Sequence, residues 1–354
     1  MAHVAAVAAA VLKRLLLPAV LIAAALQLGG CSTTLSADDQ AGIAGKTYVV
    51  TGASSGFGRG VALKLAALHA NVVLVARRTD VLEQVAREAT AAGGTPLVVG
   101  ADVSRHDEMT RLADRATARF GRIDVWINNA GVGAIGRFED IPPEDHSRVI
   151  DVNLKGVIYG SHIAMRLFKA QGAGTLVNIG SVESEVPLAY QASYAASKAG
   201  VLSLDRALRE ELRLNGLEDR IEVVTVMPWA ADTPFFTHAA NYSGGTPRMA
   251  AIDDAQKVVD AIVWVSVHPH AEWPVGWKAR GAVLSHRLFP TLTERVSGAI
   301  AHREQIETAP PAPPTSGAIH RPMAEGTGVE GGVRERMQRE DAARKEREQA
   351  APAR

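Results

Sequence analysis

The chain has 354 residues, of which 47 % are hydrophobic and 21 % are charged, so wholesale disorder is excluded. Its 38 basic and 38 acidic side chains balance, and only 5 % of residues are aromatic, so neither a global positive field nor a stacking platform points to nucleic acid. The single cysteine, Cys31, excludes an intramolecular disulfide and a cysteine-rich zinc site, and we expect no metal.

The N-terminal residues have the order of a targeting segment. Lys13 and Arg14 precede the apolar run Leu15–Leu28, which is shorter than a spanning helix of about 20 residues but suits the core of a signal peptide. Leu28-Gly29-Gly30-Cys31 then resembles a bacterial lipobox, in which the cysteine becomes lipidated. We therefore expect residues 1–30 to be a signal peptide or membrane anchor, and residues 31–44 to be a linker.

This N-terminus also sets the expected location. Basic residues ahead of an apolar run favour a cytoplasmic N-terminus. The sequence therefore predicts a membrane-associated protein, lipid-anchored through Cys31 and facing the periplasm or the cell exterior. Two alternatives stay open: residues 1–30 remain as an uncleaved anchor helix, or the start is wrongly assigned and the protein is cytoplasmic.

Residues 45–281 alternate short apolar runs with stretches of helical spacing. The expected strands are Thr47–Val50, Val72–Val75, Leu97–Val99, Val125–Ile127, Thr175–Ile179, Glu222–Met227 and, more weakly, Pro274–Trp277. Runs that are apolar throughout are typical of parallel strands buried on both faces. The pattern predicts an α/β fold, a Rossmann-type doubly wound parallel sheet of about seven strands with N- and C-terminal extensions. Ligands bind such sheets at the carboxyl ends of the strands.

A glycine-rich loop follows the first expected strand. It reads Thr51-Gly52-Ala53-Ser54-Ser55-Gly56-Phe57-Gly58 and leads into a helix. Three glycines permit a tight turn and a close approach of the backbone to a pyrophosphate, at the positive end of the following helix. Because the loop lies between a strand and a helix, we interpret it as a nucleotide-binding loop rather than an empty turn. Its spacing resembles the short-chain dehydrogenase/reductase family, single-domain branch.

The end of the second strand bears on which cofactor binds. An NAD-binding fold usually has a carboxylate here for the ribose 2′-hydroxyl, but this chain has Ala76 followed by Arg77. An arginine pairs with a 2′-phosphate through charge-assisted hydrogen bonds, so we expect NADP, with NAD less favoured. Arg59 is a candidate helper. The alternative is that these arginines lie solvated on the surface.

A tyrosine and a lysine four residues apart are the main catalytic candidates. On a helix, Tyr194 and Lys198 share one face, and a nearby ammonium favours the phenolate form of a tyrosine. Tyr194 would then exchange a proton with a carbonyl or an alcohol as general acid or base. Ser181, thirteen residues earlier, resembles the family's catalytic serine, and Asn153 resembles the asparagine that completes its tetrad and orders a proton-relay water.

The family resemblance implies further contacts with the cofactor. Asp102 and Val103 resemble its adenine contact, and Asn128-Asn129-Ala130-Gly131 resembles a signature that supports the sheet and the cofactor. The expected cofactor-binding residues are Gly52, Ser54, Ser55, Gly56, Gly58, Arg77, Asp102, Val103, Asn129, Tyr194, Lys198 and Thr233.

The loop after the sixth strand departs from the family pattern in one place. Pro228 and Thr233 match, but Trp229 replaces the usual glycine. Phe235 and Phe236 follow, and these aromatic side chains either line an apolar substrate pocket or simply pack the loop onto the core.

The C-terminal third extends beyond the usual family core. Residues 282–308 are expected to form a helical extension that covers the substrate loop or contacts a partner. Residues 309–354 begin with a proline cluster and end in a stretch of mixed charge, so we expect a disordered tail, solvated as a frayed helix at its end.

The sequence thus predicts an oxidoreductase that moves a hydride between NADP(H) and a carbonyl or secondary alcohol. Its partners would be that small molecule, a membrane through the N-terminal segment, and another copy of the chain in a homo-oligomer. A non-catalytic nucleotide-binding or scaffold protein is the alternative, and the complete set Asn153, Ser181, Tyr194 and Lys198 argues against it. A sugar-nucleotide epimerase is disfavoured by the glycine spacing and the lack of a large second domain.

Overall fold

The structure is a computed structural model that describes residues 33–350. The chain divides into two units, Met1–Thr34 and Leu35–Arg354, and the second unit forms the fold. The expected signal peptide, residues 1–30, and the lipidated Cys31 lie outside the described residues, so both stay predictions.

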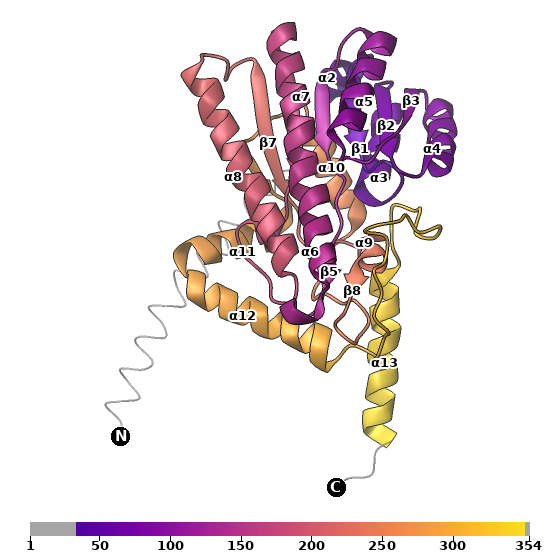
Figure 1. Cartoon of the computed structure of the whole chain (residues 1–354), viewed down its shortest axis with the longest axis vertical. Helices are drawn as coiled ribbons and strands as arrows, with labels where there is room; N and C mark the ends of the chain where they lie inside the picture. The colour runs from indigo at the N-terminus through magenta and orange to yellow at the C-terminus, as the bar shows by residue number, and fades with distance from the viewer. Residues whose placement is uncertain (1–32, 351–354) are drawn as a thin grey trace. The chain divides into compact units, whose positions relative to one another are not determined.

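A seven-stranded parallel sheet runs through the middle of this unit, in the order β3-β2-β1-β4-β6-β7-β9 (Figure 1). The strands are β1 (Thr47–Thr51), β2 (Asn71–Ala76), β3 (Thr95–Gly100), β4 (Val125–Asn128), β6 (Gly174–Ile179), β7 (Ile221–Met227) and β9 (Glu272–Pro274). β1 pairs with β2 on one side and with β4 on the other, so the strand order reverses between β1 and β4. Doubly wound sheets bind their ligands at this switch point.

Helices cover both faces of the sheet, which explains why its strands are apolar throughout. One hydrophobic cluster lies under α3 (Gly56–Ala67), α4 (Thr79–Ala91) and α10 (Ala255–Val265). The other lies under α5 (His106–Phe120), α7 (Gly156–Gln171) and α8 (Ala192–Leu214). Figure 1 shows α7 and α8 running along the second face. The predicted Rossmann-type sheet is confirmed.

The remaining elements are short or lie outside this sandwich. They are α2 (Ala37–Ile43), β5 (Ala134–Ile135), η1 (Phe138–Asp140), α6 (Pro143–Ile150), η2 (Asp151–Lys155), η3 (Val182–Ser184), α9 (Phe235–His238), β8 (Ala240–Asn241), α11 (Gly276–Leu288), α12 (Pro290–His302), η4 (Arg303–Glu307) and α13 (Val333–Ala350). β5 and β8 pair in parallel as a separate small sheet. α2 lies inside the predicted linker 31–44, where Ser36 and Asp39 form a capping box at its start.

The seventh strand and the helical extension begin earlier than predicted. β9 spans Glu272–Pro274 rather than Pro274–Trp277, and α11 begins at Gly276 rather than near residue 282. Gly276 has a φ of +78°, a left-handed conformation that favours glycine, and it separates the extended strand from the helix. Trp277 therefore belongs to α11 and is exposed.

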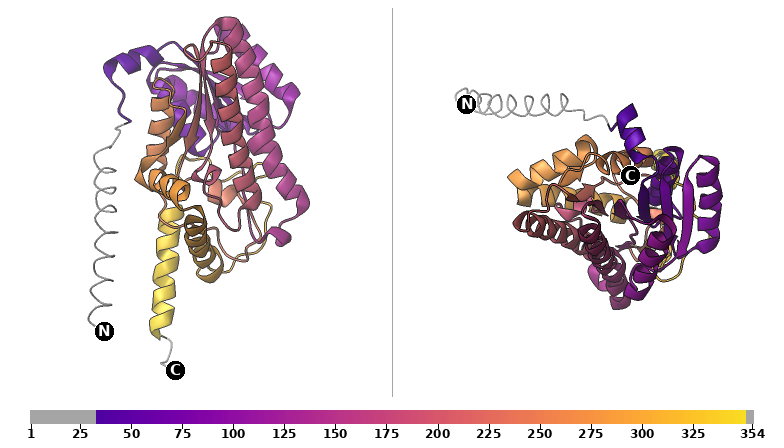
Figure 2. Two further views of the ribbon diagram at one scale, coloured as in Figure 1. Left: turned by 90° about the vertical axis from the view of Figure 1, so that its left-hand side faces the viewer. Right: turned by 90° about the horizontal axis from the view of Figure 1, so that it is seen from above.

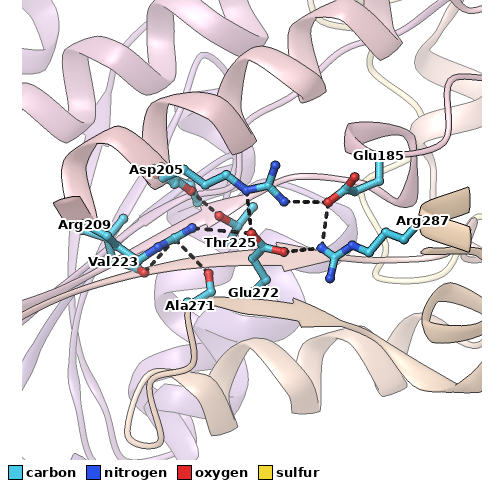
Figure 3. A network of polar contacts seen from close by, with 10 residues as sticks. Glu185, Asp205, Arg209, Val223, Thr225, Ala271, Glu272 and Arg287 are labelled. Atoms are coloured by element: carbon cyan, nitrogen blue, oxygen red, sulfur yellow. Dashed lines mark hydrogen bonds and ion pairs between the residues drawn. The ribbon is translucent and has the colours of Figure 1, made fainter. Parts of the chain in front are cut away.

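A polar network ties the edge of the sheet to α8 and α11 (Figure 3). Thr225 Oγ1 on β7 and Asn178 Nδ2 on β6 donate to the buried carboxylate of Asp205 on α8, at 2.7 and 2.6 Å. Arg287 Nη2 on α11 donates to Glu185 Oε1 at 2.8 Å and to Glu272 Oε2 at 2.7 Å. These contacts fix the start of the C-terminal extension against the core.

The C-terminal tail differs from the disordered segment that the sequence predicts. Residues 315–332 pack along the domain, and α13 follows them (Figure 2). The carboxylate of Asp232 accepts hydrogen bonds from the backbone amides of Gly331, Val333 and Arg334. The side chain of Arg248, almost fully buried, pairs with Glu340 on α13 at 2.6 Å. Specific polar contacts therefore hold a segment whose composition has few large apolar residues.

Within residues 33–350, no helix has both the length and the apolar character that crossing a bilayer requires.

Candidate active site

The glycine loop joins β1 to α3 in the conformation that its glycines allow. Gly52 has a φ of +72°, and a Cβ added there would lie 2.9 Å from Asn129 Nδ2. A Cβ on Gly58 would lie 2.3 Å from the carbonyl oxygen of Gly52, so only glycine lets the first turn of α3 pack this closely on the loop. Asn129 Nδ2 donates to the carbonyl of Thr51 at 2.8 Å and holds the loop to the end of β4.

A cavity of about 420 Å³ begins at this loop and continues past the ends of β2, β4, β6 and β7. Most of the predicted site residues line it: Gly52, Ser54, Ser55, Gly56, Arg77, Asp102, Val103, Asn129, Ser181, Tyr194, Lys198 and Thr233. Gly58 and Asn153 are not on its wall, although Asn153 lies just behind it. The volume and the mixed lining suit a small-molecule or cofactor site.

Tyr194 and Lys198 lie one turn apart on α8, as the spacing predicts. The Lys198 Nζ atom is 5.6 Å from the centre of the Tyr194 ring and donates to the carbonyl of Ile179, at the end of β6, at 2.6 Å. Ser181 follows β6 after one residue, Gly180, and it lies close enough to Tyr194 to lower the pKa of the phenol. The fold therefore brings these three side chains together at one end of the cavity.

Asn153 lies in η2, a π-helical turn between α6 and α7, and such turns are frequent at functional sites. Its Oδ1 accepts from the amide of Val132 at 2.8 Å, and its Nδ2 donates to the Val132 carbonyl at 2.9 Å. A Cβ added to Gly131 would lie 3.6 Å from Asn153 Oδ1 and 3.7 Å from Lys198 Nζ. The amide of Asn153 and the ammonium of Lys198 therefore face the same small space.

The protonation equilibria of this cluster are governed first by burial. Burial lowers the pKa of Lys198 to about 8, and a neighbouring carboxylate, Glu183, opposes that shift. Burial and the Glu183 carboxylate raise the pKa of Tyr194 above its ordinary value, and the hydrogen bond with Ser181 lowers it. The sequence predicts that Lys198 lowers the pKa of Tyr194. In the structure, burial and Glu183 have the larger influence on that pKa.

Glu183 is a site residue that the sequence patterns did not reveal. It lines the cavity two residues after Ser181, its side chain is buried, and its Oε2 has no hydrogen-bond partner among the described residues. Burial raises its pKa to about 8, and the charge of Lys198 works against that shift. The signal in the sequence that could have indicated Glu183 as a site residue is its position two residues after Ser181.

The far end of the cavity is basic. Arg78 Nε and Nη2 donate to the hydroxyl of Ser54 at 3.3 and 3.1 Å, while Arg77 lines the cavity beside it. Arg59, the predicted helper, instead pairs with Glu88 at 2.7 Å and donates to the carbonyl of Thr327 at 2.8 Å. The second arginine that lines this end of the cavity is therefore Arg78, and Arg59 does not line it.

The C-terminal tail covers the basic end. Arg77 donates to the backbone carbonyls of Ala318, Ile319 and His320 at 2.6, 3.2 and 2.9 Å. Arg78 Nη1 donates to the Met323 carbonyl at 2.9 Å. The guanidinium of Arg77 is bonded to the chain's own tail rather than solvated on the surface, and its pairing with a 2′-phosphate stays a prediction.

Asp102 and Val103 line the cavity after β3, where the resemblance places the adenine contact. The Asp102 carboxylate accepts from Arg148 Nη2 at 2.6 Å and from Ser104 Oγ at 2.7 Å. Burial raises the pKa of Asp102, but these hydrogen bonds outweigh it and hold the pKa below its ordinary value. The residue is therefore a fixed, ionised acceptor.

The loop after β7 supplies aromatic side chains to the wall of the cavity. This agrees with the interpretation that they line a pocket. Trp229, Phe235 and Phe236 all line the cavity, and the Phe235 ring centre is 5.5 Å from that of Tyr194. Trp229 Nε1 is buried without a hydrogen-bond partner in residues 33–350.

The sheet, the glycine loop, the serine after β6 and the tyrosine and lysine on α8 define a nucleotide-binding oxidoreductase of the Rossmann type. Comparison with known proteins agrees. A family model described as short chain dehydrogenase matches residues 46–242, more than half of the chain. The chain belongs to the short-chain dehydrogenase family.

One relative and two solved structures illustrate the similarity. The Bacillus subtilis (strain 168) protein described as "Uncharacterized oxidoreductase YxnA" is 31% identical over 278 residues, 78% of each chain. A 3-ketoacyl-(acyl-carrier-protein) reductase from Brucella melitensis, complexed with NADH, is 28% identical with a TM-score of 0.57, and covers 65% of this chain and 96% of its own. A metagenomic short-chain oxidoreductase in complex with NADP is 31% identical with a TM-score of 0.55, at the same coverage.

Proposed function

We propose that this protein is an oxidoreductase that transfers a hydride between NADP(H) and a carbonyl or secondary-alcohol substrate. One observation carries the proposal: a single cavity connects the glycine loop and the two arginines with Ser181, Tyr194 and Lys198. The residues fit a nicotinamide dinucleotide, because the loop offers a phosphate cradle that a Cβ would fill and the basic end offers charge for a phosphate. When bound, that cofactor supplies or accepts the hydride.

The chain's own residues move and direct the proton. The Tyr194 hydroxyl donates its proton to the substrate oxygen in the reducing direction and takes it back in the oxidising direction. Ser181 donates a hydrogen bond to the same oxygen as negative charge develops there. Lys198 in its charged form stabilises the phenolate of Tyr194, and Asn153 holds the position from which a relay water would be ordered.

NADP preference is part of the proposal and rests on the end of β2. Ala76 has no carboxylate for a ribose 2′-hydroxyl, whereas Arg78 donates to Ser54 and Arg77 lines the same cavity. The solved relatives include one complex with NADH and one with NADP, so cofactor type varies among similar proteins.

Turnover of a panel of ketones and secondary alcohols tests the proposal. We expect the full chain in mild detergent to oxidise NADPH with at least one carbonyl, and the Tyr194→Phe variant to bind NADPH without turnover. A folded wild-type protein that binds NADPH tightly but turns over no member of the panel would favour the alternative, a nucleotide-binding or scaffold protein that keeps this fold.

We also propose that the protein is held at a membrane by a lipidated Cys31 and faces the periplasm or the cell exterior. The support is the order of Lys13 and Arg14, the apolar run and Gly30-Cys31 in the sequence. Two or more acyl chains are needed for stable anchoring. Intact-mass analysis of membrane-extracted protein tests this, since a mature N-terminus at Met1 with an unmodified Cys31 would reject lipidation.

A further inference from the structure

Large hydrophobic side chains gather on the outside of α11 and α12. Of the ten such side chains that are exposed among the described residues, six lie in this helix pair and a seventh at the residue that joins the two helices. They are Trp277, Leu284, Leu288, Phe289, Leu292, Val296 and Ile300. The other three, Phe138, Ile158 and Leu214, are scattered over different elements, and scattered exposed residues need no explanation. The concentration of exposed hydrophobic side chains on α11 and α12 does need an explanation.

The spacing gives each helix an apolar stripe. Trp277, Leu284 and Leu288 are seven and four residues apart on α11, which places them on one face. Leu292, Val296 and Ile300 follow at intervals of four on α12. The two stripes meet where the helices join, at Leu288, Phe289 and Leu292. We call these seven residues the apolar face of α11–α12.

Ala279 and Val283 are buried on the opposite side of α11, and ion pairs beside the apolar face tie the helix to the rest of the fold, so this face is held outward. Arg287 bridges Glu185 and Glu272 (Figure 3), and Lys278 Nζ donates to Asp253 Oδ1 at 2.7 Å. Ser285 and Thr293 hydrogen-bond between the two helices at 2.8 Å. Figure 1 shows α11 and α12 together at the end of the fold away from β3. The exposure is therefore a fixed property of this surface.

The charge beside the apolar face is positive. Residues 276–302 contain a single carboxylate, Glu294, and its Oε1 is 3.0 Å from His286 Nε2. The same residues carry four basic side chains, Lys278, Arg280, Arg287 and Arg295, and Arg295 is exposed on α12. A helical surface with Trp, Phe and Leu beside basic side chains is typical of helices that lie in the interface of an anionic bilayer.

We propose that the apolar face of α11–α12 docks onto the surface of an anionic phospholipid bilayer. The charge selects this occupant: in a symmetric pair of copies the same basic residues would face each other, whereas anionic headgroups complement them. The sequence agrees, because only five residues separate Cys31, the proposed site of lipidation, from the start of α2 at Ala37. Even fully extended, they span no more than about 20 Å, so a lipid anchor at Cys31 would keep the domain near the bilayer.

The docked face borders the cavity of the candidate active site. Ala282 on α11 and Ser297, Ile300 and Ala301 on α12 line that cavity, and Ile300 is also exposed. A lipophilic ketone or alcohol would therefore pass from the bilayer to Tyr194 along apolar side chains. This second part of the inference rests on the proposed oxidoreductase function, while the docking itself does not.

The docking test uses Trp277 as the reporter. The full-length protein is mixed with vesicles of phosphatidylcholine and phosphatidylglycerol in equal parts, with bromine on the acyl chains as a contact quencher. The emission of Trp277 is obtained as the difference between the wild type and Trp277→Phe. We expect this emission to be quenched, and the quenching to weaken in phosphatidylcholine alone and at high salt.

Paired variants make the result specific. Leu288→Glu with Leu292→Glu should lower the docked fraction by about tenfold or more, because two apolar side chains are replaced by charges. Leu214→Glu, an equally exposed leucine on α8, is the matched control and should change nothing. Unquenched Trp277 in vesicles that hold the protein would overturn the proposal. So would a stable dimer that the paired variant dissociates, because the face would then belong to a second copy.

The substrate route has its own readout. In the same vesicles, the paired variant should lose kcat/KM for a long-chain ketone dissolved in the lipid and keep it for a short water-soluble ketone. Equal loss for both ketones would overturn the route and leave the docking result intact. Absence of turnover in the wild type would instead count against the proposed function, because Trp277 quenching does not depend on activity.

Discussion

The two ends of the cavity are built from different parts of the chain. The proposed catalytic end consists of Ser181, Tyr194 and Lys198, which lie within the family segment, residues 46–242. The basic end consists of Arg77 and Arg78 and is covered by residues 318–325, which lie beyond that segment. The proposed chemistry therefore depends on family elements. Access to the arginines that we propose bind a phosphate depends instead on a tail outside the segment that the family model matches.

The ends also differ in how their charges are compensated. At the basic end, the guanidinium of Arg77 donates hydrogen bonds to backbone carbonyls of the tail. Within the described part of the tail, no carboxylate forms an ion pair with it. At the catalytic end, Lys198 and Glu183 are buried, and each shifts the other's pKa against the effect of burial. The first arrangement is one that a competing anion can displace, while the second is fixed by packing.

The largest expected effect concerns the catalytic end. Tyr194→Phe keeps the aromatic packing against Phe235 but removes the transferable proton. We expect kcat to fall by about 10²–10⁴ with NADPH affinity nearly unchanged, which is the usual contribution of a general acid or base. Steady-state kinetics and cofactor titration measure both quantities. Near-normal turnover at saturating NADPH would remove Tyr194 from its assigned role.

A smaller effect is expected from the basic end. Arg77→Asp should weaken NADPH binding by roughly ten- to a hundredfold and affect NADH much less, because a charge-assisted contact with the 2′-phosphate is lost. Arg87→Asp, at an exposed position on α4, makes the same change in charge and is the matched control. Equal affinity of the wild type for both cofactors would refute the proposed preference.

Much of the fold and of the candidate site could be predicted from the sequence, because the patterns that indicate them involve residues close together in the chain. Apolar runs that end in glycine or polar residues predict both the parallel strands and the loops at their carboxyl ends, so Ser181 and the loop from Gly52 to Gly58 were placed correctly. The spacing of Tyr194 and Lys198 needs only one helical turn. Each of these inferences depends on a few neighbouring residues and on the switch point of the sheet.

The tail and Glu183 could not be predicted in this way. Ala318 and Met323 contact Arg77 and Arg78 through backbone carbonyls, and every residue type has a carbonyl. No side-chain pattern therefore marks a segment that binds an arginine some 240 residues earlier in the chain. Glu183 was visible in the sequence, but whether a carboxylate turns toward solvent or into a cavity is decided by how η3 packs on α8.

The tail contacts lead to a prediction of intermediate size. If the carbonyls of Ala318 and Ile319 compete with a 2′-phosphate for Arg77, NADPH should loosen the tail and NADH should not. Limited proteolysis within residues 315–332 should then become a few-fold faster with saturating NADPH, the scale of one or two weakened hydrogen bonds. NADH differs from NADPH only in that phosphate and is the natural control. Equal cleavage rates with both cofactors would show that the tail and the phosphate do not compete.

The smallest expected effect is a change in pH dependence at the catalytic end. The pKa of Glu183 is raised to about 8, so folding binds a proton that the unfolded chain releases near its ordinary pKa of 4.5. The unfolded state thus binds fewer protons between these values, and this group makes the protein less stable as pH rises from about 4.5 to 8. Glu183→Gln cannot titrate and should lack this contribution. We expect its melting temperature to fall less than that of the wild type between pH 5 and pH 8.

The same variant should alter the titration of Tyr194, since the Glu183 carboxylate raises the pKa of that phenol. The carboxylate is charged mainly above about pH 8, so only the alkaline part of the pH–rate profile should respond. In the direction of alcohol oxidation, which needs the phenolate, the rise in rate should begin at lower pH in Glu183→Gln. A purely structural role for Glu183 would lower stability and leave the shape of the profile unchanged, and that outcome would separate Glu183 from the proton chemistry of the site.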